Sequence, residues 1–345
     1  MQRNSFDSEN MFQAIYDFPE HLEAAREIGH QCEIRPYSKI QNIVVAGMGG
    51  SAIGGDIVKL LTRKMRTVPM IVSRHYKLPE FVNENSLVIC SSYSGNTEET
   101  LSAFGSAQKR NAHIIGLSTG GTLSQQFQSA NLDWVKIPEG LQPRAALGFS
   151  LVPMLFILKK LGLIKVEFEP DLISSINLLR NLRENYTLRT DENPTRVLAQ
   201  KIHSCLPLIY GETNAGAVIA LRWKGQLSEN AKMLAFHNEL PEMNHNEIVG
   251  WENNPEILKK IFVLWLCDEG EHPRINIRRK TTKNIINNLC AGQAIISSQG
   301  VSEMERWLQL IHFGDWLSYW CANFHQTDPT PVEKISHLKQ ILAQS

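Results

Sequence analysis

The order of apolar and polar positions predicts strands and helices that alternate along most of the chain. Short apolar runs rich in β-branched residues predict strands at residues 43–46, 68–72, 86–90, 113–117 and 132–137. Stretches with apolar residues three and four positions apart, which are typical of helices, separate most of these runs. Continuously apolar strands are buried on both faces, so the pattern predicts a parallel sheet with helices on both sides.

The same alternation returns in the second half of the chain. Apolar runs predict strands at residues 207–210, 261–266 and 294–296, and a long helix at 304–324. Between the halves, residues 166–195 combine a charge-rich helical stretch with a break and a new helix start near Pro194. We therefore predict two similar α/β halves joined by a helical linker. A helical segment at residues 8–35 precedes them.

Glycines and hydroxyl side chains are concentrated directly after two strands of the first half. Gly47–Ser51 reads Gly-Met-Gly-Gly-Ser, and Ser92–Thr97 reads Ser-Tyr-Ser-Gly-Asn-Thr. In a parallel sheet such turns lie at the helix N-termini, where free N–H groups favour an anion. Capping a helix needs one hydroxyl, whereas Ser92–Thr97 supplies three, so phosphate binding is favoured over capping. The counterpart in the second half is the acidic stretch 268–271, so we expect one site per chain, built mainly by the first half.

The first glycine turn also fits a dinucleotide-binding fingerprint. Residues 47–52 match the pattern GxGxx(G/A), which is a weak signal when it stands alone. An NAD site needs an acidic residue at the end of the next strand, but that strand runs into Arg74, which leaves only NADP open. The chain contains no GxxxxGK[ST] pattern, which argues against a nucleoside triphosphatase.

Composition and charge narrow the possible partners. The 345 residues are enough for about two domains, and 35 Lys plus Arg balance 35 Asp plus Glu. That balance gives no electrostatic footprint for nucleic acid or a membrane surface. The six cysteines include no CxxC pair, which argues against a zinc site and a disulfide framework and for a reducing compartment. With no signal-like N-terminus and no apolar run of about 18 residues, a cytoplasmic location is expected.

Five segments together resemble a known family. The strand entering GMGGSAIGGD and the strand entering SYSGNTEET resemble the sugar isomerase (SIS) domain. Three downstream segments are narrower: PRAAL at 143–147, ENAK at 229–232 and NHNEIVGW at 244–251. From about residue 40 to its end, the chain resembles the bifunctional phosphoglucose/phosphomannose isomerase family. The resemblance implies two SIS-type, flavodoxin-like α-β-α sandwich domains with parallel sheets. We expect these parts: an N-terminal helical segment 1–39, a first SIS domain 40–165, a helical linker 166–195, a second SIS domain 196–326 and a C-terminal helix 327–345 near the active site.

The resemblance also implies an activity and a set of site residues. It implies an aldose–ketose isomerase that interconverts glucose 6-phosphate or mannose 6-phosphate with fructose 6-phosphate through an enediolate, without metal or cofactor. Position by position, it implies that Glu229 is the base and that Arg144 lies beside the reacting carbons. It also implies that His245 and Lys334 open the sugar ring and that Thr327 makes room for both C2 epimers. The residues expected to bind the phosphate are Gly49, Gly50, Ser51, Ser92, Ser94 and Thr97. A homodimer is implied, with His245 contributed across the interface. Gly148-Phe149-Ser150 departs from the apolar continuation expected after PRAAL, which would alter the pocket wall.

Taken without the resemblance, these residues have plainer interpretations. Glu229 fits a helix-surface carboxylate paired with Lys224 or Lys232, and Arg144 fits a surface-loop arginine equally well. A lone histidine is usually structural, and Lys334 fits an exposed helix position. Three other functions stay open: another SIS sugar-phosphate isomerase, a non-catalytic sugar-phosphate sensor, and an NADP oxidoreductase. The joint presence of PRAAL and NHNEIVGW argues against the first, and the presence of both Glu229 and Arg144 argues against the second.

Overall fold

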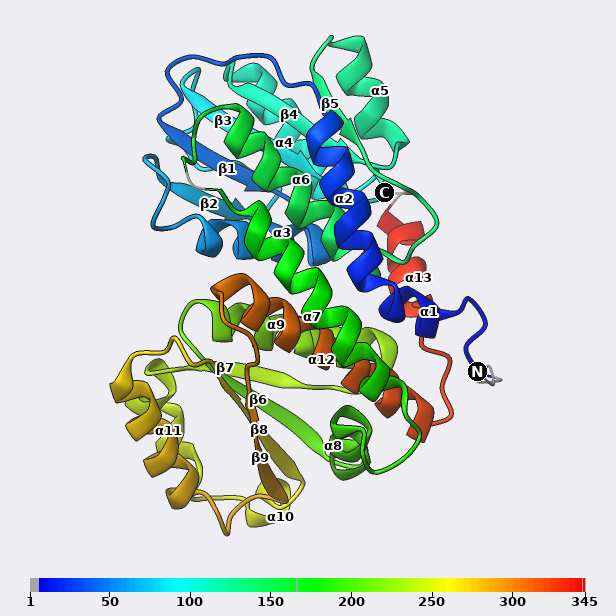
Figure 1. Ribbon diagram of the computed structural model, residues 1–345, viewed down its shortest axis with the longest axis vertical. Helices are drawn as coiled ribbons and strands as arrows, with labels where there is room; N and C mark the ends of the chain where they lie inside the picture. The colour runs from blue at the N-terminus through cyan, green and yellow to red at the C-terminus, as the bar shows by residue number, and fades with distance from the viewer. Residues whose placement is uncertain (1–5, 166, 343, 345) are drawn as a thin grey trace. The chain divides into compact units, whose positions relative to one another are not determined.

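The computed structural model describes residues 6–165, 167–342 and 344 (Figure 1). Residues 1–5, 166, 343 and 345, which fall within the expected N-terminal segment, linker and C-terminal helix, lie outside the described residues. The chain divides into two compact units. The first unit comprises residues 17–178 and 302–305, and the second unit comprises the rest.

Five parallel strands form the sheet of the first unit, in the order β2-β1-β3-β4-β5 (Figure 1). The strands are β1 (Asn42–Ala46), β2 (Met70–Ser73), β3 (Ser86–Ser91), β4 (His113–Ser118) and β5 (Asp133–Lys136). The central strand β3 is buried at all six positions. This is the flavodoxin-like order, and the parallel sheet predicted from the apolar runs is confirmed. The direction in which strands are added reverses between β1 and β3, which makes that point the topological switch point of the sheet.

Helices cover both faces of this sheet. They are α2 (Phe18–Gln31), α3 (Gly49–Leu61), α4 (Glu98–Lys109), α5 (Gly121–Ser129), the 3-10 turn η1 (Pro143–Ala145), α6 (Leu147–Lys160) and the start of α7 (Glu169–Thr187). Phe104 of α4 and Phe127 of α5 pack against Val44 and Val88, whose side chains share one face of the sheet. On the opposite face, Gly55 of α3 lies against Val45. Alternate residues of the same strands therefore belong to two different helix layers.

Helix α6 is buried at each of its first twelve positions. This buried stretch includes Gly148, Phe149 and Ser150, the three residues that depart from the expected apolar pattern. Gly148 packs against Leu22 of α2, and the Ser150 hydroxyl donates to the Leu147 carbonyl at 3.0 Å. Within the first unit this departure is accommodated in the core.

The predicted N-terminal helix is two helices, α1 (Met11–Tyr16) and α2. The break falls at Asp17, and Pro19 follows in the first turn of α2. A proline fits there because the first-turn N–H groups have no partner within the helix. The apolar spacing continues across Asp17, which is why periodicity alone did not reveal the break.

The second unit repeats the strand order of the first without its last strand. Its sheet has the order β7-β6-β8-β9, and all pairings are parallel. The strands are β6 (Leu206–Glu212), β7 (Phe236–Leu240), β8 (Ile261–Cys267) and β9 (Gly292–Ser297). The sequence pattern predicted β6, β8 and β9 and missed β7.

Two helices of the second unit agree closely with the sequence prediction. The helix predicted at 304–324 spans 303–324, and the helix start predicted near Pro194 falls at Pro194. The full set is α1, the end of α7, α8 (Pro194–Ile202), α9 (Ala215–Asn230), η2 (Glu242–His245), η3 (Glu247–Gly250), α10 (Pro255–Leu258), α11 (Pro273–Ile285), α12 (Glu303–Phe324) and α13 (Glu333–Leu342). The Asn193 side chain caps α8 by accepting from the N–H groups of Thr195 and Arg196, at 3.0 and 3.1 Å. Trp223 of α9 stacks on Phe313 of α12 in the core, with ring centroids 5.6 Å apart.

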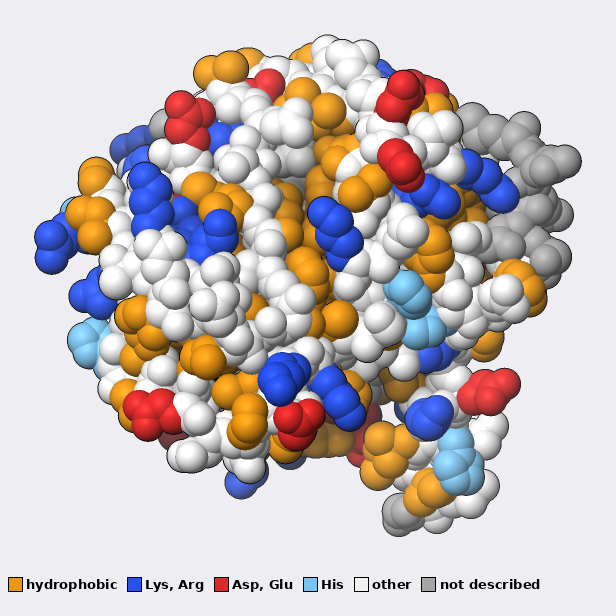
Figure 2. Space-filling view, turned by 90° about the horizontal axis from the view of Figure 1, so that it is seen from below, with side chains coloured by type: hydrophobic (Ala, Val, Ile, Leu, Met, Phe, Trp, Pro, Cys, Tyr) orange, Lys and Arg blue, Asp and Glu red, His pale blue; other side chains and the backbone are white. Residues whose placement is uncertain are grey.

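Charges of both signs are distributed over the face drawn in Figure 2, with apolar side chains between them. This mixture agrees with the balance of acidic and basic residues in the sequence. Across the described residues, no helix combines the length and the apolar character needed to cross a bilayer.

Candidate functional site

The two glycine-and-hydroxyl turns lie side by side at the switch point of the first sheet. β1 and β3 pair in register, with Ala46 opposite Cys90, so the turns that follow them start next to one another. The approach is close, because a Cβ atom added to Gly47 would stand 2.8 Å from the Ser91 carbonyl oxygen. A glycine is needed where two backbones come this near. Ligands of open α/β sheets bind beyond the strand ends at such a point.

The Ser92–Thr97 turn is held by its own polar groups. The hydroxyls of Ser92 and Thr97 are 2.8 Å apart, and the Gly95 N–H donates to Ser92 Oγ at 3.1 Å. The Asn96 N–H donates to Ser94 Oγ at 3.2 Å. Thr97 is the N-cap residue of α4, but in the described structure its side chain makes no capping hydrogen bond to that helix. Helix capping therefore does not account for this cluster of hydroxyls.

Arg144 comes close to the first of these turns. A Cβ atom on Gly50 would meet the Pro143 carbonyl oxygen at 2.9 Å, and Cα of Arg144 at 3.8 Å. The Leu141 N–H donates to the Tyr93 hydroxyl at 2.9 Å, which ties the loop before Arg144 to the Ser92–Thr97 turn. Arg144 is only 4% exposed, so the interpretation as a surface-loop arginine is wrong. Arginine stays protonated in proteins, so this buried guanidinium is a fixed positive charge.

The structure thus gathers in the first unit the residues expected to bind phosphate. Gly49 has a φ of +49°, and Gly50 and Ser51 follow it in the first turn of α3. Two helix N-termini, those of α3 and α4, begin at these turns. Helix N-termini attract anions through their unpaired N–H groups and the helix dipole.

A third turn, which the sequence analysis missed, supports the Ser92–Thr97 turn. It follows β4 and reads Ser-Thr-Gly-Gly-Thr at 118–122. The Thr122 N–H donates to Asn96 Oδ1 at 2.9 Å, and the Leu123 N–H donates to the Gly95 carbonyl at 2.9 Å. The signal was present, because this turn combines glycine and hydroxyl residues after a strand as the other two do.

Arg74, the residue that left an NADP site open, forms an ion pair with Asp56 of α3. Its guanidinium is therefore engaged with a carboxylate of its own unit.

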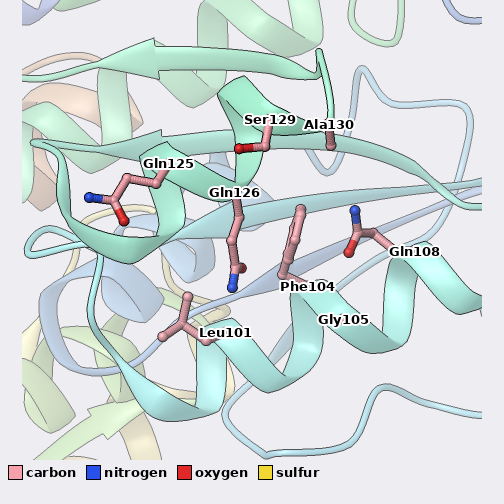
Figure 3. A pocket seen from close by; sticks show the side chains of 8 residues that line it. All are labelled: Leu101, Phe104, Gly105, Gln108, Gln125, Gln126, Ser129 and Ala130. Atoms are coloured by element: carbon pink, nitrogen blue, oxygen red, sulfur yellow. The ribbon is translucent and has the colours of Figure 1, made fainter.

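A separate hollow of about 450 Å³ in the first unit lies between α4 and α5, lined by Leu101, Phe104, Gly105, Gln108, Gln125, Gln126, Ser129 and Ala130 (Figure 3). These residues are distinct from those predicted for the site.

In the second unit, three of the predicted residues line one cavity of about 610 Å³. Glu229 reaches it from the last turn of α9, Thr327 from the segment after α12, and Lys334 from the first turn of α13. Apolar side chains, among them Met233 and Val332, line it as well. The cavity therefore combines a carboxylate and an ammonium group with a partly apolar wall.

The helix that carries Glu229 is anchored through buried polar contacts to α12. Arg222 makes two hydrogen bonds to Asp315, at 3.1 and 2.7 Å, and Gln226 donates to the same carboxylate at 2.7 Å. One turn further on, Asn230 Nδ2 donates to Ser318 Oγ at 2.9 Å. Burial raises the pKa of the Asp315 carboxyl, and the neighbouring Arg222 guanidinium opposes that rise. These contacts hold α9 against α12 along the turns that lead to Glu229.

His245 closes η2 and is exposed, outside the set of residues that line this cavity. Its neighbours are well anchored: Asn244 donates to Thr282 Oγ1 at 2.8 Å, and Asn246 donates to Glu242 Oε1 at 2.7 Å. Met243 is buried beneath the turn. His245 thus lies on a turn held by these hydrogen bonds and is exposed.

Comparison with known proteins identifies the family. Two family models match the chain: "SIS domain" over residues 37–159 and "Bacterial phospho-glucose isomerase C-terminal SIS domain" over residues 191–342. The chain is 42% identical to a bifunctional phosphoglucose/phosphomannose isomerase of Caldicellulosiruptor bescii, over 97% of this chain and 99% of the relative. The chain belongs to the bifunctional phosphoglucose/phosphomannose isomerase family. A second relative of the same name, from Aquifex aeolicus, is 37% identical over 90% of this chain and 92% of its own.

Solved structures agree with the fold of a phosphoglucose/phosphomannose isomerase family member built from two SIS domains. The C-terminal domain of glucosamine-fructose-6-phosphate aminotransferase from Francisella tularensis matches with a TM-score of 0.69 at 15% identity. That match covers 96% of this chain and all of the other. At such low identity the likeness concerns the fold alone. It confirms two SIS-type units with parallel sheets, as the resemblance implied.

Proposed function

We propose that this chain is an aldose–ketose isomerase that interconverts glucose 6-phosphate and mannose 6-phosphate with fructose 6-phosphate. One observation carries the proposal. Glu229, Thr327 and Lys334 stand far apart in the sequence and have distinct expected roles, yet they line a single cavity. The names of the Caldicellulosiruptor and Aquifex relatives describe the same two isomerase activities.

We propose that the turns at the first switch point bind the phosphate group. Candidate donors are the hydroxyls of Ser51, Ser92, Ser94 and Thr97, together with N–H groups at Gly49 and Gly50. The chain has no net charge to attract an anion, so local donors and helix N-termini have to supply the affinity. Support comes from the position of both turns at the switch point and from the internal bonding that holds the Ser92–Thr97 turn in shape.

In the proposed reaction, Glu229 is the base. Its carboxylate takes the proton from C2 of the open-chain aldose, and the electrons of that C–H bond form the C1–C2 double bond. The carbonyl oxygen on C1 takes up the negative charge, which the fixed guanidinium of Arg144 stabilises. The C2 hydroxyl then gives its proton to the oxygen on C1, which leaves the negative charge on the C2 oxygen. Glu229 returns its proton to C1, where the electrons of the C1–C2 double bond form the new C–H bond, and an electron pair of the C2 oxygen forms the ketose carbonyl. His245 and Lys334 assist ring opening, and Thr327 leaves room for both configurations at C2. Because Arg144 supplies the positive charge, the proposed reaction needs no metal.

We also propose a homodimer in which His245 acts in the neighbouring chain's site. The exposure of His245 and its position outside the cavity lined by Glu229 support this. The test is a mixture of His245→Ala and Glu229→Gln chains, each nearly inactive alone. In a mixed dimer one site has both residues intact, so random exchange restores roughly a quarter of full activity in an isologous C2 pair. Mixtures that stay inactive despite demonstrated subunit exchange would contradict the shared site.

The first experiment incubates EDTA-treated protein with fructose 6-phosphate and assays the two aldose products separately. Both products at comparable rates support the full proposal. Glucose 6-phosphate alone keeps the mechanism and removes the role given to Thr327. Absence of product, with fructose 6-phosphate still bound, favours a non-catalytic sugar-phosphate sensor.

The base is tested by Glu229→Gln, which keeps size and polarity but removes the proton acceptor. We expect kcat to fall by roughly a thousandfold, in line with the usual contribution of a general base, with sugar-phosphate binding retained. Glu256→Gln, an exposed carboxylate in α10, is the matched control and should leave kcat unchanged. A Glu229→Gln variant with most of its activity would show that another group is the base.

A different sugar-phosphate reaction is the second candidate. A D-glucosamine-6-phosphate 4-epimerase of Sulfolobus acidocaldarius is 32% identical over 60% of this chain and 63% of its own length. Conversion of glucosamine 6-phosphate without any isomerisation of fructose 6-phosphate would favour it.

A further inference from the structure

Lys232 adopts a backbone conformation that a lysine seldom takes. It follows the end of α9 with a φ of +56°. The turn around it is closed by the Met233 N–H, which donates to the Leu227 carbonyl at 3.1 Å. The left-handed position after a helix is usually occupied by glycine, because a side chain is disfavoured there. A residue that holds this conformation without being glycine points to a use for its side chain.

The Lys232 ammonium group joins two segments that form the cavity. It donates to the Glu229 carbonyl at 2.7 Å and to the Pro329 carbonyl at 3.0 Å. The first carbonyl belongs to the C-terminal end of α9, where the helix dipole favours a positive charge. The second belongs to residues 327–335, the tail segment that brings Thr327 and Lys334 to the cavity.

The tail segment is buried at its start and exposed along its helix. Pro329 and Thr330 are buried, at the point where Lys232 binds. Asp328 accepts from the Thr330 N–H at 2.9 Å, which shapes the turn locally. Beyond them, all ten side chains of α13 are exposed. The bond from Lys232 therefore acts where the tail is held, and Lys334 lies on the part that projects from it.

We propose that Lys232 is a positioning residue that holds the tail segment against the Glu229 end of α9. It acts through Thr327 and Lys334 and does not touch the reacting atoms. Glu229 and Lys334 then keep a fixed separation during the reaction, which positioned groups require. The inference rests on the proposed function of this cavity, and it gives Lys232 a positioning role that the resemblance did not assign.

The test is Lys232→Gly, which removes the ammonium group and suits the left-handed backbone. We expect an unchanged or higher Tm together with a fall in kcat of roughly tenfold, as for a small displacement of reacting groups. KM should change by less than about twofold, because the proposed phosphate donors belong to the other unit. Lys232→Arg, which can donate to both carbonyls, should restore most of the activity.

Lys39→Gly is the matched control. Lys39 also has a left-handed φ, of +60°, and is exposed in the loop before β1. The same substitution there should leave kcat unchanged. A Lys232→Gly variant that kept wild-type kcat, or an equal loss in Lys39→Gly, would overturn the inference.

Two further measurements separate this inference from the proposed function. In a Lys334→Ala background, adding Lys232→Gly should change kcat by less than about twofold if Lys232 acts through the tail. An undiminished tenfold loss in that background would contradict the proposal. Amide hydrogen exchange over residues 327–342 should also accelerate in Lys232→Gly and not in Lys39→Gly, a result that needs no enzymatic activity. Absence of isomerase activity in the wild-type protein would remove the proposed function, whereas unchanged exchange would remove the tether.

Discussion

The two sheets share one strand order, yet the turns at their switch points are chemically opposite. In the first unit, the Ser92–Thr97 turn after β3 has hydroxyls bonded to one another and to local N–H groups. In the second unit, the residues after β8 are acidic and paired with arginines. Asp268 accepts from Arg306 at 2.8 Å, and Glu271 pairs with Arg279, where both side chains are at most 5% exposed.

The difference teaches that topology alone does not make a binding site. Both switch points offer strand ends and helix N-termini, but the turn after β3 contains hydroxyl residues where the turn after β8 contains carboxylates. At the second, Asp268 and Glu271 each pair with an arginine, so these two carboxylates already have a counter-charge. The chemistry at each switch point follows the residues of the turn and not the fold.

The largest expected contrast comes from one glycine in each turn. In Gly95→Ala the new Cβ would stand 1.8 Å from the Gly120 carbonyl oxygen, on a backbone with a φ of +68°. The turn then cannot keep its shape, and we expect kcat/KM for fructose 6-phosphate to fall by about a thousandfold or more, roughly 4 kcal/mol. In Gly270→Ala the new Cβ meets the ends of the Arg306 and Asp268 side chains, which can shift. Steady-state kinetics on both variants checks this, and equal losses would remove the contrast.

Second in size is Arg279→Met, which removes one partner of the buried pair. Burial raises the pKa of Glu271, and Arg279 opposes the rise, so the variant leaves a buried carboxyl without its counter-charge. We expect the free energy of unfolding to fall by about 3 kcal/mol, with KM for fructose 6-phosphate unchanged. Denaturant unfolding measures the first and kinetics the second. Lys280→Met, at an exposed position of the same helix, is the control, with a change within about 0.5 kcal/mol. A raised KM in Arg279→Met would mean that the second switch point also takes part in binding.

A smaller effect is expected from one hydroxyl in each unit. Ser92→Ala removes the partner of Thr97 and of the Gly95 N–H, and we expect KM to rise roughly tenfold, the value of one hydrogen bond to a charged group. Ser298→Ala removes a donor to Asp268 at 2.8 Å and should lower stability by about 1 kcal/mol without changing KM. Titration with sugar phosphate distinguishes the two. A Ser92→Ala variant with wild-type KM would contradict phosphate binding at this turn.

The smallest effect is expected from Tyr93→Phe. The variant loses the bond from the Leu141 N–H that ties the loop before Arg144 to the Ser92–Thr97 turn. We expect kcat to fall about threefold, close to the net value of a single neutral hydrogen bond. Tyr37→Phe, which loses a bond to Asp133 at 3.0 Å in the same unit, is the control and should affect stability only. An equal fall in kcat for both variants would indicate a general loosening of the unit.

Much of the fold could be predicted from the sequence, because buried parallel strands have a continuous apolar signature. The sequence pattern missed strand β7 because Phe236–Leu240 is an edge strand with only one buried residue. Its polar residues therefore resemble those of a loop. The break at Asp17 escaped because apolar spacing reports which face is buried, not whether the helix axis continues.

The candidate site residues likewise divide into those that the local sequence predicted and those that it did not. Local sequence indicated the hydroxyl turn, since glycine and hydroxyl residues after a strand carry their own physical meaning. The grouping of Glu229, Thr327 and Lys334 depends on tertiary packing between distant segments, and only the family resemblance pointed to it. The conformation of Lys232 had no signal at all, because nothing in Asn-Ala-Lys-Met specifies a left-handed residue.

The position of helix α6 late in the first unit's sequence also affects when that unit can be completed during synthesis. It packs against α2, where Gly29 lies under the ring of Phe156 and His30 contacts the same ring at 4.7 Å between centroids. These partners are separated by most of the unit's sequence, so this pairing closes a very long loop, which costs chain entropy. During synthesis, the turn at Gly47–Ser51 emerges well before the helix that packs behind it. Helix α6 can therefore cover the first sheet only after the ribosome has passed Lys160.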